Sequence, residues 1–164
     1  MSPDPDRSTA RDFSIRLATN ADETAIRRVL YSVRLEYDVH QDGDTGDGNL
    51  ADIERNYFAA GGCFEVVEDA AGRIVGCAGL CRLSERRAEL CKMYIEKPAR
   101  GHGLGKRLLE DMLAVARRSG FAEVWLETNS TLLKAISLYA RYGFRPVPSD
   151  HLLCRCDQAY LIQL

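Results

Sequence analysis

Apolar and polar residues alternate in several short runs along the chain, and this alternation predicts β-strands. The first run covers residues 13–18. Two more, residues 63–68 and 73–81, flank the turn sequence Asp-Ala-Ala-Gly at 69–72, which predicts a hairpin. A further strand is expected over residues 87–95, after a polar turn. These strands follow one another directly, so we expect them to pair in antiparallel fashion.

Other segments repeat apolar residues at intervals of three and four, which is the spacing of an amphipathic helix. One such helix is predicted over residues 21–38. A second follows Gly105 and ends at Gly120, and a third is expected over residues 131–142. A shorter helix is possible over residues 50–58.

The C-terminal part of the chain predicts two more strands. Residues 122–128 follow the second helix, so this strand can lie parallel to the strand at 87–95. Asn129 or Ser130 is expected to cap the third helix. Pro146 and Pro148 are expected to break the chain before a closing strand at 159–164.

Length and charge limit the functional classes. The 164 residues predict a loose tail at 1–12 and a single domain at 13–164. A net charge of −2 argues against a nucleic-acid-binding protein. No stretch approaches the roughly 20 apolar residues of a membrane span, and the N-terminus lacks the apolar region of a secretory signal. We therefore expect a cytoplasmic protein that binds neither membranes nor nucleic acid.

The six cysteines do not form a metal-binding pattern. Cys63, Cys77, Cys81 and Cys91 lie in apolar runs, where a thiol behaves as a small buried group. No C-x-x-C pair occurs, and the pair at 154 and 156 has no second pair at zinc-site spacing. We expect free, reduced thiols and no metal.

An acidic, glycine-rich segment at residues 41–48 predicts a loop. It does not match the EF-hand pattern, because Gly46 occupies the third acidic position. Two interpretations remain. The loop is either solvated and flexible, or it is a lid whose Asp42, Asp44 and Asp47 attract an amine.

The sequence Arg-Gly-His-Gly-Leu-Gly at residues 100–105 joins a predicted strand to a predicted helix. Its glycines leave the backbone amides accessible, and the helix N-terminus adds roughly half a positive charge, so the turn is suited to a phosphate. The spacing fits neither the dinucleotide fingerprint G-x-G-x-x-G nor the P-loop.

The loop instead resembles the acyl-CoA pyrophosphate loop of the GNAT N-acetyltransferase superfamily, [QR]-x-x-G-x-[GA], through Arg100, Gly103 and Gly105. A second family pattern, A-x-x-[LF]-Y-x-x-x-G-F, is matched further along the chain by Ala135, Leu138, Tyr139, Gly143 and Phe144. The resemblance extends over about residues 13–164, and its motifs lie within 89–144. Leu132 departs from it, because many members carry an Asn there that helps to hold the cofactor.

This resemblance implies an α+β fold with α/β/α layers. Its sheet would be mixed, mostly antiparallel and twisted, with about six or seven strands, a splayed parallel pair at 87–95 and 122–128, and helices on both faces. The pantetheine arm of acetyl-CoA would enter the splay, and the loop amides would hold the pyrophosphate with charge from Arg100 and Lys106. The residues expected to contact this co-substrate are Met93, Tyr94, Ile95, Arg100, Gly101, His102, Gly103, Leu104, Gly105 and Lys106.

Direct acetyl transfer requires an acid for the departing thiolate and a base for the amine. The resemblance indicates Tyr139 as the acid, while an amide near Met93 or Tyr94 could meet the oxyanion. Glu89 is the leading candidate for the base, and strand alternation predicts that it faces the same way as Met93 unless a bulge intervenes. Glu127, His151 and water are the alternatives.

The resulting hypothesis is an acetyl-CoA-dependent N-acetyltransferase that acts on a primary amine of a small molecule, such as an amino acid, a metabolite or a drug. Transfer would be direct, through a ternary complex. The alternatives are a protein N-terminal or lysine acetyltransferase and a non-catalytic acyl-CoA-sensing module. A homodimer is possible. The acceptor depends on residues 39–60 and 145–158, which match no pattern.

Overall fold

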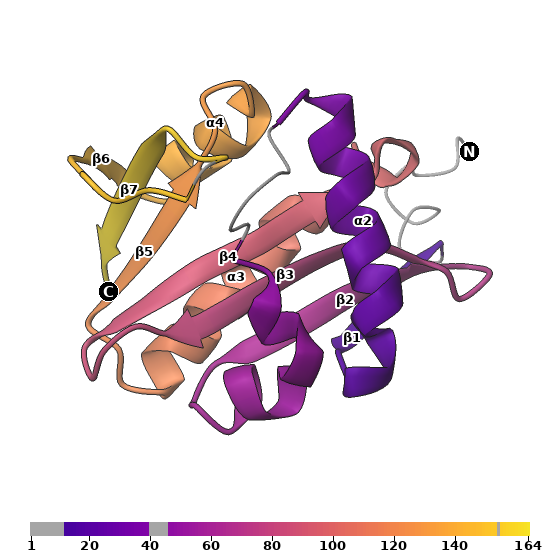
Figure 1. Cartoon of the computed structure of the whole chain (residues 1–164), viewed down its shortest axis with the longest axis horizontal. Helices are drawn as coiled ribbons and strands as arrows, with labels where there is room; N and C mark the ends of the chain where they lie inside the picture. Colours follow the sequence, from indigo (N-terminus) through magenta and orange to yellow (C-terminus); the bar gives the residue numbers. More distant parts are fainter. Residues whose placement is uncertain (1–11, 40–45, 154) are drawn as a thin grey trace, which may run out of the picture.

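The computed structural model describes residues 12–39, 46–153 and 155–164. Within them lies one seven-stranded sheet (Figure 1) of order β1-β2-β3-β4-β5-β7-β6. Neighbouring strands are antiparallel except β4 and β5, which are parallel. The strands are β1 (Phe13–Leu17), β2 (Cys63–Asp69), β3 (Ile74–Arg82), β4 (Arg87–Ile95), β5 (Glu123–Thr128), β6 (Arg145–Val147) and β7 (Gln158–Gln163).

Helices cover both faces of this sheet, as the family resemblance implied (Figure 1). The α-helices are α2 (Glu23–Glu36), α3 (Leu104–Arg118) and α4 (Leu133–Arg141). The predicted helix at 50–58 is instead a 3₁₀ turn, η2 (Gly48–Asp52), followed by a π turn, η3 (Glu54–Phe58). Two further 3₁₀ turns are η1 (Asn20–Asp22) and η4 (Lys97–Ala99).

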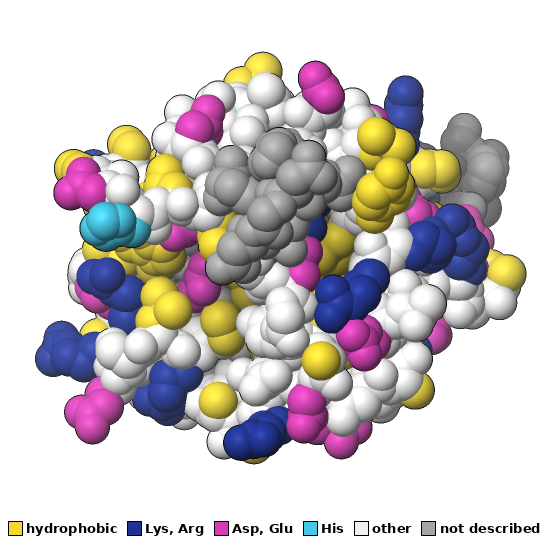
Figure 2. Space-filling view, in the orientation of Figure 1, with side chains coloured by type: hydrophobic (Ala, Val, Ile, Leu, Met, Phe, Trp, Pro, Cys, Tyr) yellow, Lys and Arg dark blue, Asp and Glu magenta, His cyan; other side chains and the backbone are white. Residues whose placement is uncertain are grey.

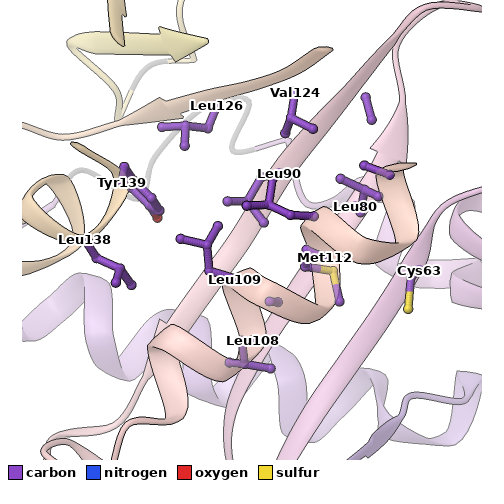
Figure 3. Close-up of a cluster of buried hydrophobic side chains, with 14 of the residues drawn as sticks. Cys63, Leu80, Leu90, Leu108, Leu109, Met112, Val124, Leu126, Leu138 and Tyr139 are labelled. Atoms are coloured by element: carbon purple, nitrogen blue, oxygen red, sulfur yellow. The ribbon is translucent and has the colours of Figure 1, made fainter. Parts of the chain in front are cut away.

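Each face has its own apolar core. On one face, Ile26 and Leu30 of α2 pack with Phe64 of β2. On the other, side chains of α3 meet those of β3, β4, β5 and α4 (Figure 3), with Leu108, Leu109 and Met112 of α3 fully buried. Burial of one such side chain stabilises the fold by about 1.5–3 kcal/mol, so the helical spacing of apolar residues accounts for the position of α3.

Two local predictions near the C-terminus were wrong. The proline segment does not simply interrupt the chain, because Pro146 lies inside β6 and is paired with Tyr160. β6 is at the end of the strand order, and proline is tolerated in an edge strand, where its missing amide hydrogen is not needed. The N-cap of α4 is Leu132 rather than Asn129 or Ser130, since Asn129 accepts hydrogen bonds from Thr131 before the helix begins.

A bulge interrupts β4. The register between β3 and β4 shifts by one residue between Cys91 and Tyr94, and Lys92 within this interval has a positive φ of 54°. An extra residue in one strand reverses the alternation of side chains beyond it. The prediction that Glu89 and Met93 share a face is therefore wrong: Met93 packs against the core on the α3 side, whereas Cys91 packs on the α2 side.

The surface shows no strong separation of charge in the view of Figure 2, where acidic and basic side chains are interspersed. No helix in the described ranges has the length and apolarity needed to span a bilayer. Among the described cysteines, five are free thiols: Cys63, Cys77, Cys81, Cys91 and Cys156.

Candidate active site

The parallel strands β4 and β5 pair over a short distance and then separate. Their pairing starts with Arg87 and Glu123 and ends with Glu89 and Trp125. β4 then continues to Ile95 and β5 to Thr128 without further pairing between them in the described residues. Backbone groups at a strand edge need hydrogen-bonding partners. An extended ligand can supply them where β5 no longer pairs with β4. The predicted splay of the parallel pair is confirmed.

Two cavities meet where the strands part. The first, of about 250 Å³, lies on the side of Glu89, Glu127 and Tyr139, and we call it the acceptor-side cavity. The second, of about 300 Å³, extends toward the glycine loop, and we call it the loop-side cavity. Their common wall consists of Met93, Tyr94, Leu132 and Ala135. The two cavities are therefore adjacent.

The glycine loop forms one end of the loop-side cavity, which Arg100, Gly101, Leu104 and Gly105 line. Gly103 is the N-cap of α3 and has a φ of 72°, in the left-handed region that favours glycine. A Cβ atom added at Gly103 would meet nothing within 4 Å, so there is open space beside the backbone. Exposed backbone at a helix N-terminus suits an anion such as a pyrophosphate.

The charged side chains of this loop contact other groups of the protein. The Arg100 guanidinium is bound to Glu36 at 2.7 and 2.8 Å, and its Nε donates to the carbonyl of Ile95. Arg100 also lowers the pKa of Glu36 by hydrogen bonding. Lys106 is exposed and lies 3.9 Å from Glu110, while the exposed His102 ring contacts the Phe13 ring at a tilted angle of 51°. Arg100 thus lines the loop-side cavity while its charge is paired with Glu36.

Two carboxylates line the acceptor-side cavity. Burial raises the pKa of Glu89, and the nearby charge of Glu127 adds to this effect. Glu127 accepts a hydrogen bond from the amide of Leu153 at 3.1 Å. The positive charges of Lys92 and Arg155 act in the opposite direction on the pKa of Glu89. His151, the other candidate for the base, is exposed and is not part of either cavity's lining.

A thiol pair lies beside Glu89. The Cys81 sulfur is 3.6 Å from Glu89 Oε2 and 4.0 Å from the sulfur of Cys91, and the Tyr57 hydroxyl is 3.8 Å from Cys91. Hydrogen bonding from Cys81 lowers the pKa of Cys91 despite its burial. The Cys81 thiol is therefore the polarizable group in contact with Glu89.

Buried cations also surround this cavity, and no sequence pattern indicated them. Arg34 binds Asp47 through two nitrogens at 2.5 and 3.0 Å, while Lys92 donates to the Gly46 carbonyl at 3.0 Å and lies 3.8 Å from Asp47. Burial opposes ionisation of Asp47, but Arg34 nevertheless lowers its pKa. Arg155 is buried and lines the same cavity.

Asp47 is buried and paired with Arg34, so the interpretation of the acidic segment as solvated is wrong for this residue. Asp42 and Asp44 lie outside the described residues. The four charged positions 34, 47, 92 and 155 are distant in sequence, which is why no local motif revealed the cluster.

Tyr139 extends from α4 into the acceptor-side cavity. It is 5% exposed, and Figure 3 shows it next to Leu126 with its hydroxyl directed away from α4. Burial, with a contribution from Tyr94, raises the pKa of Tyr139, so the phenol stays protonated at neutral pH. Tyr142 differs, because its hydroxyl donates to Glu110 on α3, away from both cavities. Of these two tyrosines, Tyr139 is the one that lines the acceptor-side cavity.

With this geometry established, comparisons with known proteins identify the family. Residues 27–144 match the family model described as acetyltransferase (GNAT) family. This chain belongs to the GNAT family. A relative named uncharacterized N-acetyltransferase YjgM, from Escherichia coli K12, is 36% identical over 138 residues, which is 81% of this chain and 82% of that protein. Human N-acetyltransferase 8B is 33% identical over 103 residues, 59% of this chain and 45% of that protein.

Solved structures show the same GNAT fold. A GNAT-family acetyltransferase from Staphylococcus aureus superposes with a TM-score of 0.83 at 25% identity, covering 92% of this chain and 98% of that one. A GNAT phosphinothricin acetyltransferase from Sinorhizobium meliloti, solved with acetyl-CoA, gives a TM-score of 0.71 at 20% identity, covering 93% and 89%. The family and its named relatives indicate an N-acetyltransferase of the GNAT type.

Proposed function

We propose that this protein transfers an acetyl group from acetyl-CoA to a primary amine of a small molecule, directly and within a ternary complex. The observation that carries the proposal is the meeting of two cavities at the β4–β5 splay. One leads to a glycine loop, and the other contains a carboxylate and a protonated phenol.

The residues present fit acetyl-CoA. Backbone amides of the loop at 100–105 and the N-terminus of α3 would hold the pyrophosphate. The unpaired edge of β4 at Met93 and Ile95 would hydrogen-bond the pantetheine amides as a neighbouring strand does. The S. meliloti relative of the same fold binds acetyl-CoA, which supports this assignment. When bound, acetyl-CoA supplies the acetyl group as a thioester.

Glu89 and Tyr139 would perform the two proton transfers. An alkylammonium has a pKa of roughly 10 and is not nucleophilic until it loses a proton. Glu89 accepts that proton, directly or through water, and its raised pKa brings it closer to neutrality than an exposed carboxyl. An amide of Met93 or Tyr94 donates to the carbonyl oxygen, where negative charge develops. Tyr139 then gives its proton to the departing sulfur.

The dimensions of the site favour a small acceptor. The cavity of about 250 Å³ is lined by α4, β4, β5, the segment before β7 and residues 39, 46 and 49, and its volume is below the usual range for drug-sized ligands, about 300–1,000 Å³. An extended peptide would require an open groove. We therefore favour a small amine over a protein substrate.

The test is a screen for acetylated product. The protein is mixed with acetyl-CoA and a panel of small primary amines and amine-bearing peptides, and both free thiol and acetylated acceptor are measured. Transfer to at least one small amine, and loss of transfer in Tyr139→Phe, is the expected result. Transfer to peptides alone would replace the small acceptor with a protein one. Binding of acetyl-CoA with no acetylated product from any amine would refute the enzymatic function.

A further inference from the structure

Two half-buried thiols face each other across β3 and β4. Cys81 of β3 is in register with Glu89 of β4, and Cys91 lies two residues further along β4. Both side chains pack on the α2 face of the sheet, and their sulfur atoms are 4.0 Å apart. A disulfide holds its sulfurs at about 2.05 Å. The bulge that follows Cys91 interrupts the regular pairing of β4, which leaves the backbone there room to adjust.

The two thiols differ in reactivity. Hydrogen bonding from Cys81 lowers the pKa of Cys91, and the charge of Lys92 acts in the same direction. The same hydrogen bond, together with burial, raises the pKa of Cys81. The thiolate is the form of cysteine that reacts with peroxides, so Cys91 is the thiol that reacts first. Cys156 lines the same cavity, but burial raises its pKa to about 11 and keeps it protonated at neutral pH.

The surroundings of the pair supply a route for an oxidant and an acceptor for a proton. Cys91 lines the acceptor-side cavity of about 250 Å³, which is large enough for a small peroxide. The Cys81 sulfur is 3.6 Å from Glu89 Oε2, so this carboxylate can accept the Cys81 proton. An attacking thiol, a second thiol and a base therefore lie together at one edge of the cavity.

We propose that Cys81 and Cys91 form a redox-modification site, at which hydrogen peroxide converts the two thiols into a disulfide that slows acetyl transfer. The Cys91 thiolate attacks one peroxide oxygen, the O–O bond breaks, and a sulfenic acid forms as hydroxide leaves. The Cys81 sulfur then attacks the sulfenic sulfur, its proton passes to Glu89, and the S–O bond breaks as a second hydroxide leaves. Once both hydroxides are protonated, two thiols have been oxidised and one peroxide has been reduced to two waters.

The disulfide would act on transfer through Glu89, so this part of the inference rests on the proposed function. Burial raises the pKa of Glu89, and the hydrogen bond from Cys81 partly offsets that effect. Disulfide formation removes the Cys81 hydrogen and draws its sulfur toward Cys91. Glu89 then loses a donor that stabilises and orients its ionised form. A lost hydrogen bond to a charged group corresponds to a fall in kcat/KM of about tenfold.

Mass spectrometry tests the modification itself. The folded protein is treated with hydrogen peroxide, its remaining thiols are blocked with iodoacetamide, and it is digested with trypsin without reductant. Trypsin cuts after Arg82 and Arg87, so the disulfide should join peptide 74–82 to peptide 88–92. Fragmentation of the linked pair distinguishes Cys81 from Cys77, which lies in the same peptide. Linkage through Cys77, or treated protein without this linked pair, would overturn the proposal.

Serine variants separate the roles of the two thiols. Cys91→Ser lacks the attacking thiol and should form no linked pair. In Cys81→Ser the sulfenic acid has no second thiol to react with, so dimedone should label Cys91 in peptide 88–92. Cys63→Ser is the matched control, because Cys63 is a free thiol buried on the α3 side of the sheet and should not affect the linkage. Melting temperatures show whether each variant is folded.

Transfer is then measured as acetylated product, with an acceptor from the amine screen and after the peroxide has been removed. The wild type and Cys63→Ser should lose about tenfold in kcat/KM and regain it with dithiothreitol. Cys91→Ser should keep the same kcat/KM before and after treatment. A linked pair with an unchanged rate, or a folded Cys91→Ser that loses as much rate as the wild type, would overturn control by this disulfide.

The outcomes distinguish this inference from the proposed function. Acetyl-CoA binding with no acetylated product from any amine would refute the proposed function, and with it the control of transfer. The linked peptides would still decide whether Cys81 and Cys91 are a modification site. A wild type that acetylates an amine but forms no linked pair would refute the modification site alone.

Discussion

Arg100 and Glu36 form an ion pair with two nitrogen–oxygen contacts, which joins the glycine loop to the last turn of α2. Glu36 therefore offsets the one arginine expected to attract the pyrophosphate. Glu36→Gln should strengthen acetyl-CoA binding, on the order of threefold, because a negative charge near the anion site is removed. Calorimetry measures this, with Glu23→Gln, at the opposite end of α2, as control. Weaker binding would show that the ion pair instead maintains the shape of the loop.

Tyr139→Phe should lower kcat and leave acetyl-CoA affinity nearly unchanged, since only the proton for the departing sulfur is lost. Loss of a general acid typically costs about 100- to 10,000-fold. Tyr142→Phe is the matched control, because its hydroxyl binds Glu110 outside the cavities. If the two variants are equally active, Tyr139 is not the general acid.

Glu89→Gln should lower kcat by a similar factor and change the pH profile. A base works only when deprotonated, so wild-type kcat/KM should rise with pH through the pKa of Glu89, which burial places above the ordinary value of 4.5. The variant should lack this rise. Glu123→Gln, on β5 but outside the cavity lining, should retain it. If the pH profile of kcat/KM is unchanged in Glu89→Gln, the general base is Glu127 or water instead.

Gly103→Ala tests the glycine loop. Gly103 and Gly72 both have positive φ, 72° and 78°, and neither has a neighbour that a Cβ would contact. Alanine at either position should destabilise the fold by about 1 kcal/mol through backbone strain. Only Gly103→Ala should also weaken acetyl-CoA binding. If the two variants bind acetyl-CoA equally well, the loop is a structural turn.

Glu65 on β2 makes stability depend on pH. Burial and the neighbouring Asp111 of α3 raise its pKa to about 7, from 4.5. The folded protein therefore keeps a proton that the unfolded chain releases, and this contribution to stability is complete below pH 4.5 and is lost as pH rises through 7. The fall in melting temperature from pH 5 to pH 8 should be smaller in Glu65→Gln than in the wild type. Exposed Glu85→Gln is the control, and identical slopes in all three proteins would contradict the assignment.

Local sequence patterns were sufficient for most of the fold. Side-chain alternation predicted the bounds of β4, and helical spacing placed the buried face of α3, because both signals arise from neighbouring residues. The bulge at Lys92 was not predictable in this way. Lysine does not indicate a left-handed backbone, so nothing in the local pattern showed that Met93 would turn away from the face of Glu89.

The sequence indicated only those parts of the site that belong to local motifs. Glycine spacing indicated the loop at residues 100–105, and a second motif indicated Tyr139. In the structure the loop lines the loop-side cavity, and Tyr139 lines the adjoining acceptor-side cavity. The buried charges depend on long-range packing instead. Arg34, Asp47, Lys92 and Arg155 come from α2, a loop, β4 and the segment before β7, and only the folded chain assembles them.

The early end of pairing between β4 and β5 also has a mechanical consequence. In the described residues, the strand pairing between the C-terminal segment, which contains β5, α4, β6 and β7, and the rest of the sheet consists of the three residue pairs of β4 and β5. A donor molecule bonded to the free edge of β4 and packed against α4 would act as a brace between these two parts. Binding of acetyl-CoA should then slow amide hydrogen exchange in both parts. The exchange rate would therefore show whether acetyl-CoA is bound.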